Sequence, residues 1–391
     1  MGSVKSIGNF IIKAGGKMFF RTAMISLLLA GILTGSTGCS QEMVAERELV
    51  DRAKAIHERA LTLDTHVDIK LAYATAELDP GTDNPKLKCD LVKMNKGEVD
   101  GVFLIVYVKQ GQRNAEGYEK AYKTAMVRFN AIRRLTGQMY PERCELATSP
   151  DDFERISKTG KRAIMIGVEN GFAIGQELKK LREFYELGAR YVTLTHIGHN
   201  DICDSSVPRE ALGDKKTEHN GLTKFGREVV GEMNRLGMMC DASHISDESF
   251  FDLIKVSKAP IIASHSSCRA IAEHPRNLAD EQLVSLAKNG GVIQITAVNS
   301  FLRPASGVEA DVKTFVDHIE HVVKLVGIDY VGIGSDFDGG GGIEGFNDHC
   351  EAFNVTIELV RRGYSEEDIC KIWSGNFLRV WREVEAIAKE L

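Results

Sequence analysis

The sequence lacks an excess of positive charge. Lys and Arg number 49 against 55 Asp and Glu, which gives a formal net charge of -6. Binding to nucleic acid needs basic residues gathered on one surface, and no basic stripe runs along this chain. We therefore expect no nucleic-acid partner. With 43% apolar and 27% charged residues, the composition is that of an ordinary globular protein.

Several local signatures are also absent. The eight cysteines form no close CxxC pair, which argues against a structural zinc knuckle. We expect most of the seven cysteines after Cys39 to be buried free thiols. The glycine run 339–342 is not followed by GK[ST], so we expect a loop rather than a phosphate cradle. No nucleophile elbow surrounds the serines beside His265, which argues against a serine hydrolase.

The N-terminus has an apolar run that is too short for a comfortable membrane span. Four basic residues precede the apolar stretch 23–33, and small residues then lead to Cys39 in "LTGSTGCSQ". This order is typical of a secretory signal, and the cysteine resembles that of a bacterial lipoprotein signal. We expect a signal peptide at 1–38, export, and a lipid anchor at Cys39 that holds the chain at the cell envelope; an ordinary cleaved signal is the alternative.

Residues 39–391 show an alternating pattern of strands and helices. Between the expected strands, stretches such as 223–236 and 312–326 carry apolar residues at helical spacing and are closed by glycine. Short apolar segments that we expect to be strands recur at Leu61–Asp64, Val102–Val108, Ala163–Val168, Tyr191–Thr195, Met238–Asp241, Pro260–Ser264, Gly291–Thr296 and Tyr330–Ser335.

This alternation indicates parallel strands joined by helical crossovers. Eight such strands, with no Pro/Gly-rich linker to divide them, predict an α/β fold in the form of one (β/α)8 TIM-type barrel. A doubly wound open sheet is the alternative, because periodicity alone does not show that the sheet closes.

The first strand segment ends in an unusual way. In "LTLDTHVDIK", residues 61–70, His66 and Asp68 stand two positions apart and so project to the same face at the end of the strand. A shared divalent cation would offset the cost of burying both groups. A hydrogen-bonded His/Asp pair is the simpler alternative for this motif taken alone.

Other expected strands end in the same residue types. The carboxyl ends of barrel strands meet at one rim, where active sites are built. Three imidazoles with two or three carboxylates suffice for two zinc-like ions, and Glu169, which lies between the two groups in sequence, has two oxygens with which to bridge them. The residues at the remaining strand ends are Glu169, His196, His244, His265, Asp336 and Asp338.

An ordered set of motifs from about residue 45 to residue 385 resembles the membrane dipeptidase (renal dipeptidase) family of zinc peptidases, within the amidohydrolase-like barrels. The motifs are "DTHVD", "GVENG", "YVTLTH", "CDASHISDESF", "SHSSCRAIAEHPRN", "GIGSDFDG" and "SGNFLRV". The resemblance implies a zinc-dependent hydrolase that cleaves dipeptides by means of a metal-bridging hydroxide. Members of the family tend to accept D-residues at the C-terminal position.

The resemblance also implies a role for individual residues. His66 and Asp68 would bind one zinc, His244 and His265 would bind the other, and Glu169 would bridge the two ions. In the same comparison, His196 would contact the substrate and the tetrahedral intermediate, Arg276 would pair with the substrate's terminal carboxylate, and Asp336 would move protons.

The loop "DFDGGGGIEGFND" is richer in glycine than is usual for this family, so the chemistry transfers more safely than the substrate. Two other functions remain open: hydrolysis of another amide, a lactam or an ester, or metal or peptide binding by a lipoprotein without turnover. The sequence also leaves a homodimer open.

Some polar residues are expected to have ordinary roles. His318 and His321 fall on the polar side of their helix, which predicts surface positions. His57, His219 and His349 lie outside the strand ends and are expected to be solvent-facing or loop residues. His199 is not needed as a metal ligand. Asp338 points to the same side as Asp336 and is expected to support it.

Overall fold

The computed structural model describes residues 43–303 and 309–391. The chain divides into two units, residues 1–51 and 52–391, and the described part of the first is helical. The predicted signal peptide and Cys39 lie outside the described residues. The second unit carries the barrel and the predicted site at the strand ends.

The second unit is built on a nine-stranded sheet in which every pair of neighbouring strands is parallel. Eight strands follow the order β1-β2-β4-β5-β6-β7-β8-β9, and β3 pairs with β4 outside that path. The strands are β1 (Leu63–Asp68), β2 (Gly101–Tyr107), β3 (Cys144–Leu146), β4 (Arg162–Glu169), β5 (Ala189–Thr193), β6 (Met239–Asp241), β7 (Ile262–Ser266), β8 (Val292–Ile295) and β9 (Val331–Ile333).

The two ends of this path meet, which nearly closes the barrel. Val67 of β1 forms a parallel bridge with Phe337, just after β9, and the Asp68 amide donates to the Phe337 carbonyl at 2.9 Å. The expected eight-stranded barrel is therefore confirmed. The first strand runs to Asp68 rather than stopping at Asp64, and the three-residue strand β3 was not predicted.

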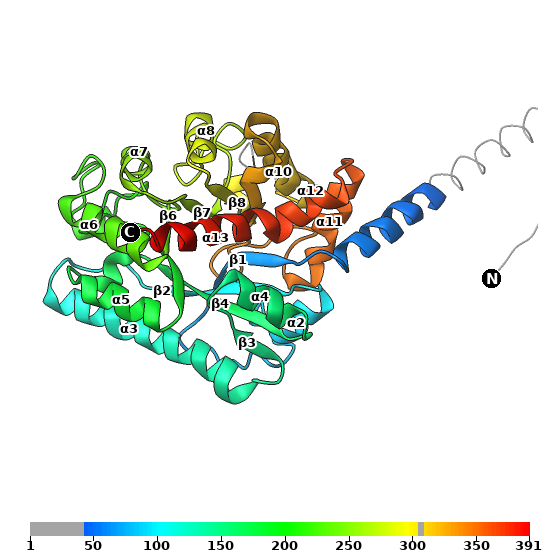
Figure 1. The fold of residues 1–391 in the computed structure, drawn as a ribbon, viewed down its shortest axis with the longest axis horizontal. Coiled ribbons are helices and arrows are strands. Elements are labelled where there is room, and N and C mark those ends of the chain that lie inside the picture. Colours follow the sequence, from blue (N-terminus) through cyan, green and yellow to red (C-terminus); the bar gives the residue numbers. More distant parts are fainter. Residues whose placement is uncertain (1–42, 304–308) are drawn as a thin grey trace, which may run out of the picture. The chain divides into compact units, whose positions relative to one another are not determined.

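Helices fill the connections between the strands (Figure 1). The α-helices are α2 (Leu91–Lys96), α3 (Ala115–Arg134), α4 (Pro150–Ser157), α5 (Leu178–Glu186), α6 (Lys224–Leu236), α7 (Asp247–Val256), α8 (Asp280–Lys288), α9 (Asn299–Leu302), α10 (Val312–Val326), α11 (Ala352–Arg361), α12 (Glu366–Cys370) and α13 (Asn376–Ala388). The shorter helical segments are η1 (Leu135–Met139), η2 (Gly171–Ile174), η3 (Glu210–Leu212), η4 (Ile328–Tyr330), η5 (His349–Glu351) and η6 (Lys371–Gly375).

The predicted helix ends agree with local capping. The Thr223 side chain accepts the Gly226 amide at the start of α6, and Gly237 ends that helix in the left-handed conformation with φ of 72°. Asp311 caps α10, and Ser365 caps α12 by accepting the Asp368 amide. These short polar residues satisfy backbone groups that have no partner inside the helix.

The hydrophobic core closes the end of the barrel opposite the predicted site. Leu63, Ile262 and Val292 stand at or next to the amino ends of their strands and pack with Phe377 and Trp381 of α13. In Figure 1, α13 (red) crosses the strands. Burying these large apolar side chains stabilises that end and leaves the carboxyl ends of the strands free to carry polar groups.

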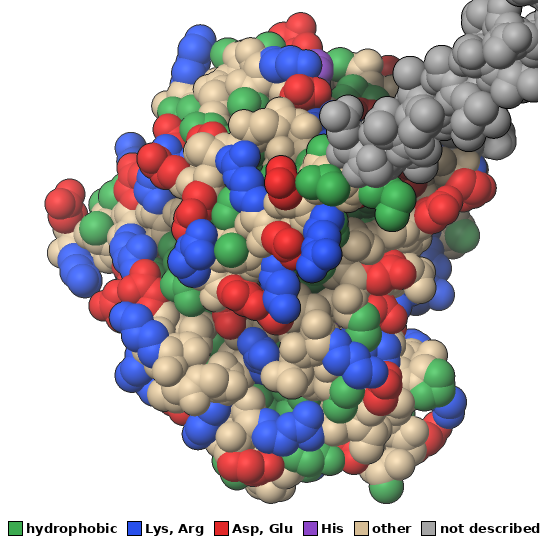
Figure 2. All heavy atoms as spheres, turned by 90° about the vertical axis from the view of Figure 1, so that its right-hand side faces the viewer, with side chains coloured by type: hydrophobic (Ala, Val, Ile, Leu, Met, Phe, Trp, Pro, Cys, Tyr) green, Lys and Arg blue, Asp and Glu red, His purple; other side chains and the backbone are tan. Residues whose placement is uncertain are grey.

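The surface carries charges of both signs. On the face drawn in Figure 2, Lys and Arg side chains alternate with Asp and Glu over short distances. The seven described cysteines are free, and five of them are buried, as expected for structural thiols. Within 43–303 and 309–391, no helix combines the length and apolar character needed to cross a bilayer.

Candidate metal centre

Glu169, the last residue of β4, stands at the centre of the predicted site. Its Oε1 lies 3.8 Å from His66 Nε2, 3.0 Å from His244 Nε2 and 3.4 Å from His265 Nε2. His196 Nε2 is 3.9 Å from the same oxygen. Four imidazoles from four different strand ends therefore converge on one carboxylate oxygen, because parallel strands bring their carboxyl ends to one rim.

The acidic side of the site is formed by Asp68 and Asp336. His66 Nε2 lies 3.9 Å from Asp68 Oδ2 and 4.0 Å from Asp336 Oδ1. Asp336 adopts a left-handed backbone with φ of 60°, which is costly for a residue with a side chain. The amides of the next glycines, Gly339, Gly340 and Gly341, all donate to the Asp336 carbonyl, at 3.2, 3.0 and 2.7 Å. The loop thus holds this carboxylate at the rim.

His244 follows β6 and also has a left-handed backbone, with φ of 72°. Its Nε2 lies 3.0 Å from His265 Nε2, and its Nδ1 is buried without a hydrogen-bond partner. A strained residue at a cluster of ligand types is a common feature of functional sites.

Arg276 is the buried cation of the site. It is 5% exposed, its Nη2 donates to the His265 carbonyl at 3.2 Å, and its guanidinium lies 5.6 Å from the centre of the Phe301 ring. Its Nε is buried without a hydrogen-bond partner. A planar guanidinium with a free donor is suited to a carboxylate ligand.

These residues open onto a cavity of about 480 Å³, which is within the range of small-molecule sites. Its lining combines polar and apolar side chains. The lining residues are Asp68, Glu169, His196, Ile197, Val207, His244, His265, His274, Pro275, Arg276, Val298, Ser300, Phe301, Asp336, Gly339 and Gly340.

Burial dominates the electrostatics of the cluster. It raises the pKa of Glu169 well above its usual value, and the Asp336 carboxylate adds to that shift. Burial likewise raises the pKa of Asp68, with Glu169 as the next cause, and that of Asp336, with Asp68 as the next cause. The buried carboxylates therefore repel one another.

The pKa values of the imidazoles shift in the opposite direction. Burial is the main cause that lowers the pKa of His66, His244 and His265. It lowers the pKa of His196 to about 3, with smaller contributions from the Arg276 and Arg209 cations. Neutral imidazoles beside crowded carboxylates are the state in which a divalent cation is bound best.

The residues present fit a metal centre. His66 Nε2 is buried, has no hydrogen-bond partner and faces three carboxylates within 4.0 Å. Three overlapping groups of side chains offer ligand atoms within 4.8 Å of one another, and Glu169 belongs to two of them. The groups are His66, Glu169 and His265; Glu169, His196 and His244; and His66, Asp68 and Asp336.

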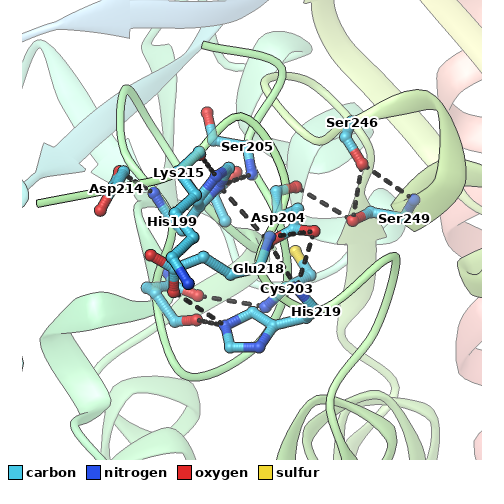
Figure 3. Close-up of polar contacts among 12 residues, drawn as sticks. His199, Cys203, Asp204, Ser205, Asp214, Lys215, Glu218, His219, Ser246 and Ser249 are labelled. Carbon is cyan, nitrogen blue, oxygen red and sulfur yellow. Dashed lines mark hydrogen bonds and ion pairs between the residues drawn. The ribbon is translucent and has the colours of Figure 1, made fainter. Parts of the chain in front are cut away.

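The loop that carries His196 is pinned by a separate hydrogen-bond network (Figure 3). His199 is 1% exposed; its Nε2 donates to the Lys215 carbonyl at 2.8 Å, and its Nδ1 accepts the Ser205 amide at 2.9 Å. The Asp204 carboxylate accepts the backbone amides of residues 218–220. His199 thus holds the loop and does not line the cavity.

Asp338 differs from its prediction. Its carboxylate accepts the amides of Lys88, at 3.1 and 3.2 Å, and Cys89, at 3.4 Å, and so anchors residues 88–89 rather than supporting Asp336. Like Asp336, Asp338 has a left-handed backbone, with φ of 63°.

The sequence did not indicate Arg128 of α3 or Tyr107 of β2. Arg128 is 8% exposed, and its guanidinium lies 5.7 Å from the centre of the Tyr107 ring, which in turn packs edge-on against His196 at 4.8 Å. Its charge acts on Asp68 and Glu169. The sequence of a helix does not show that one of its arginines faces the end of a distant strand.

Comparisons with known proteins agree with this geometry. Residues 50–391 match the family described as membrane dipeptidase (Peptidase family M19). The chain is 36% identical over 304 residues to dipeptidase tcpJ of Claviceps purpurea, which covers 76% of this chain and 70% of that protein. It is 34% identical over 365 residues to an uncharacterized dipeptidase of Schizosaccharomyces pombe, covering 88% of this chain and 86% of the relative.

A solved structure is similar as well. The probable dipeptidase PvdM from Pseudomonas aeruginosa superposes with a TM-score of 0.84 and 31% identity, covering 87% of this chain and 99% of that one. The barrel and its rim of ligand types define a metal-dependent hydrolase. The chain belongs to the membrane dipeptidase family and is a hydrolase that acts on peptide bonds.

Proposed function

We propose that the protein hydrolyses dipeptides at a centre that holds two zinc ions. His66 and Asp68 would hold one ion, His244 and His265 the other, and Glu169 would bridge them. The observation that carries the proposal is that three of these imidazoles lie within 3.8 Å of Glu169 Oε1, and that Glu169, His244 and His265 line a cavity together with a buried arginine.

When bound, the two zinc ions supply a hydroxide at neutral pH and polarise the peptide carbonyl. The Asp336 carboxylate, which lies beside Asp68 and His66, would accept a proton from the attacking water and return it to the leaving amine. His196 has a pKa lowered to about 3, so it is neutral and would donate an N–H to the developing oxyanion.

Arg276 would bind the substrate's free carboxylate. It lines the cavity and has a buried Nε with no hydrogen-bond partner, so a carboxylate would satisfy a donor that the fold leaves unpaired. An anchor of this kind contacts the chain end rather than the side chain, and we propose that D-residues are accepted at the C-terminal position. Longer peptides, whose carboxylate would lie further from the scissile bond, are expected to be poor substrates.

A panel of substrates tests the proposal. The purified protein is assayed with L-L and L-D dipeptides, with the matching dipeptide amides and with a tripeptide, each after chelation and after adding zinc back. We expect zinc-dependent hydrolysis of the dipeptides and losses of about ten- to a hundredfold in kcat/KM for the amides, because a charge-assisted pair contributes roughly 1.5–3 kcal/mol. Amides cleaved as fast as free dipeptides would remove the role of Arg276. Undiminished cleavage after complete chelation would overturn the zinc proposal.

We also propose that the chain is exported and lipid-anchored through Cys39. The support is the order of basic, apolar and small residues that precede this cysteine. In a bacterial host, labelled fatty acid should be incorporated into the wild type and not into Cys39→Ser. A Cys39→Ser variant that stays in the membrane fraction would contradict the anchor.

A further inference from the structure

We infer that two buried hydroxyl groups, those of Tyr191 and Ser264, fix the tautomers of His66 and His265 and thereby tune the two metal positions separately. The inference rests on the proposed function, because it assumes that the cluster binds two ions. It concerns residues outside the set of ligands, on strands that run beneath the rim.

Tyr191 of β5 determines the tautomer of His66. Its hydroxyl oxygen lies 3.0 Å from the Thr65 carbonyl oxygen and 2.9 Å from His66 Nδ1. A carbonyl only accepts, so the Tyr191 O–H donates to Thr65, and its oxygen is left to accept the N–H of His66 Nδ1. The proton of His66 therefore sits on Nδ1, and its Nε2 lone pair faces the carboxylates.

The backbone makes room for this contact. Tyr191 is fully buried, and a Cβ on Gly167 of β4 would overlap its ring. The glycine lets the ring cross the barrel interior and reach His66, which is 125 positions away in sequence. This is a close approach that only a residue without a side chain permits.

Ser264 of β7 determines the tautomer of His265 in the same way. Its Oγ lies 2.6 Å from Asp241 Oδ2 and 2.9 Å from His265 Nδ1. Asp241 also accepts the Thr193 hydroxyl at 2.5 Å and the amides of Ser264 and Ser243 at 2.8 and 3.0 Å. A carboxylate only accepts, so the Ser264 O–H donates to Asp241, and Ser264 Oγ is left to accept the N–H of His265 Nδ1.

The two hydroxyls are assigned to different rings by distance. Ser264 Oγ is also 3.4 Å from His66 Nδ1, but that nitrogen has a single hydrogen and the Tyr191 oxygen is closer, at 2.9 Å. The imidazoles of His66 and His265 lie against each other, with centroids 3.7 Å apart. Each ring thus has its own support, although the rings are neighbours. His244 has none, since its Nδ1 is unpartnered.

Loss of such a support lowers metal affinity by about ten- to a hundredfold. We therefore expect Tyr191→Phe to weaken the ion held by His66, and Ser264→Ala to weaken the ion held by His265. Thr193→Val is the matched control, because it removes another hydroxyl from Asp241 without touching an imidazole. Ser264→Thr keeps the hydroxyl and should restore the affinity that Ser264→Ala loses.

The experiment titrates each metal-free full-length variant with Zn²⁺ in competition with a chromophoric chelator and follows Co²⁺ absorption in parallel. Circular dichroism establishes that each variant is folded. Repeating the titrations in a His66→Ala background assigns the effects: Tyr191→Phe should then change nothing, and Ser264→Ala should still weaken the remaining ion.

The outcomes separate this inference from the proposed function. Wild type that binds two ions, with Tyr191→Phe and Ser264→Ala unchanged, overturns the role of the hydroxyls alone. A Thr193→Val effect equal to that of Ser264→Ala, or a failure of Ser264→Thr to restore binding, also overturns it. Wild type that takes up no metal overturns the proposed function itself.

Discussion

The amide of Asp336 donates to the carbonyl of His66 at 2.9 Å. This bond lies at the seam where the last strand meets the first, next to the bridge between Val67 and Phe337. The group proposed to carry protons and a proposed metal ligand are therefore joined by backbone. Closure of the barrel and assembly of the site depend on the same few residues.

Substitutions of the glycines after Asp336 test whether the junction between the last and first strands sets the geometry of the site. A Cβ on Gly339 would overlap Asp68 Oδ2 and Asp336 Oδ1, whereas one on Gly340 would lie 3.5 Å from Asp336 Oδ2 and 3.6 Å from Val298. We expect Gly339→Ala to lower metal affinity and kcat/KM by about ten- to a hundredfold, because it displaces both carboxylates. The neighbouring Gly340→Ala should stay within about threefold of wild type. Equal effects of the two substitutions would contradict this account.

Removal of metal should destabilise the protein in a pH-dependent way. A carboxyl group whose pKa is raised on folding holds its proton more tightly when folded, so the metal-free form loses stability as pH rises above about 4, the ordinary value. Asp68, Glu169 and Asp336 all shift in this direction. Bound cations offset the cost, so the gain in Tm on adding zinc should grow from pH 4.5 to pH 7.5.

Melting curves with chelator and with zinc, taken at several pH values, measure this gain. The three buried imidazoles have lowered pKa values, so they stay neutral in the folded state while the unfolded chain takes up protons below about pH 6.5. They therefore destabilise both forms towards low pH. A zinc-dependent gain that shrinks as pH rises would show that the carboxylates are not ligands.

The barrel could be predicted because each strand is a short apolar run buried on both faces. The convergence of the strand-end side chains could be predicted because parallel strands bring their carboxyl ends together, as Glu169 and His265 illustrate. The first strand was predicted too short, since His66 and Asp68 are polar residues that interrupt its apolar pattern. The strand β3 was missed because three residues carry almost no periodicity.

Buried polar residues were the least predictable. His318 was expected on the surface but is fully buried, with Nδ1 accepting the Cys268 amide and Nε2 donating to the Leu302 carbonyl, both at 3.0 Å. His57 and His349 are 2% and 1% exposed, again contrary to prediction. A helical pattern distinguishes polar from apolar residues, but it does not show which polar residues find partners elsewhere in the fold.

The sequence did not single out Arg128, but the effect of its positive charge on the nearby carboxyl groups can be tested. Its positive charge lowers the pKa of Asp68 and Glu169, against the larger effect of burial. Arg128→Met keeps most of the packing volume and removes the charge, so both carboxyl groups should hold their protons to higher pH. We expect the pH midpoint of metal loading to rise, with a smaller change in Arg128→Lys. Bound metal after dialysis at a series of pH values measures this, and identical midpoints in wild type and Arg128→Met would contradict it.

A final prediction concerns the buried contact between His349 and Asp64. His349 Nε2 lies 2.9 Å from Asp64 Oδ2, and both side chains are almost fully buried. His349→Leu would leave the carboxylate with only the amides of His66 and Ser335 as donors, at 3.2 and 2.9 Å, and should lower the free energy of unfolding by about 3 kcal/mol.

His321 supplies the matched control for His349, because it pairs with Asp280 at a similar 2.8 Å but with both side chains partly exposed. Water screens such a pair, so His321→Leu should cost about 0–1 kcal/mol. Denaturant unfolding of the two variants measures the difference. Replacing Asp64 by Asn in the His349→Leu variant should recover part of the loss, because it removes the unpaired charge. Equal costs for His349→Leu and His321→Leu would mean that burial of the Asp64 carboxylate does not set the energy of this pair.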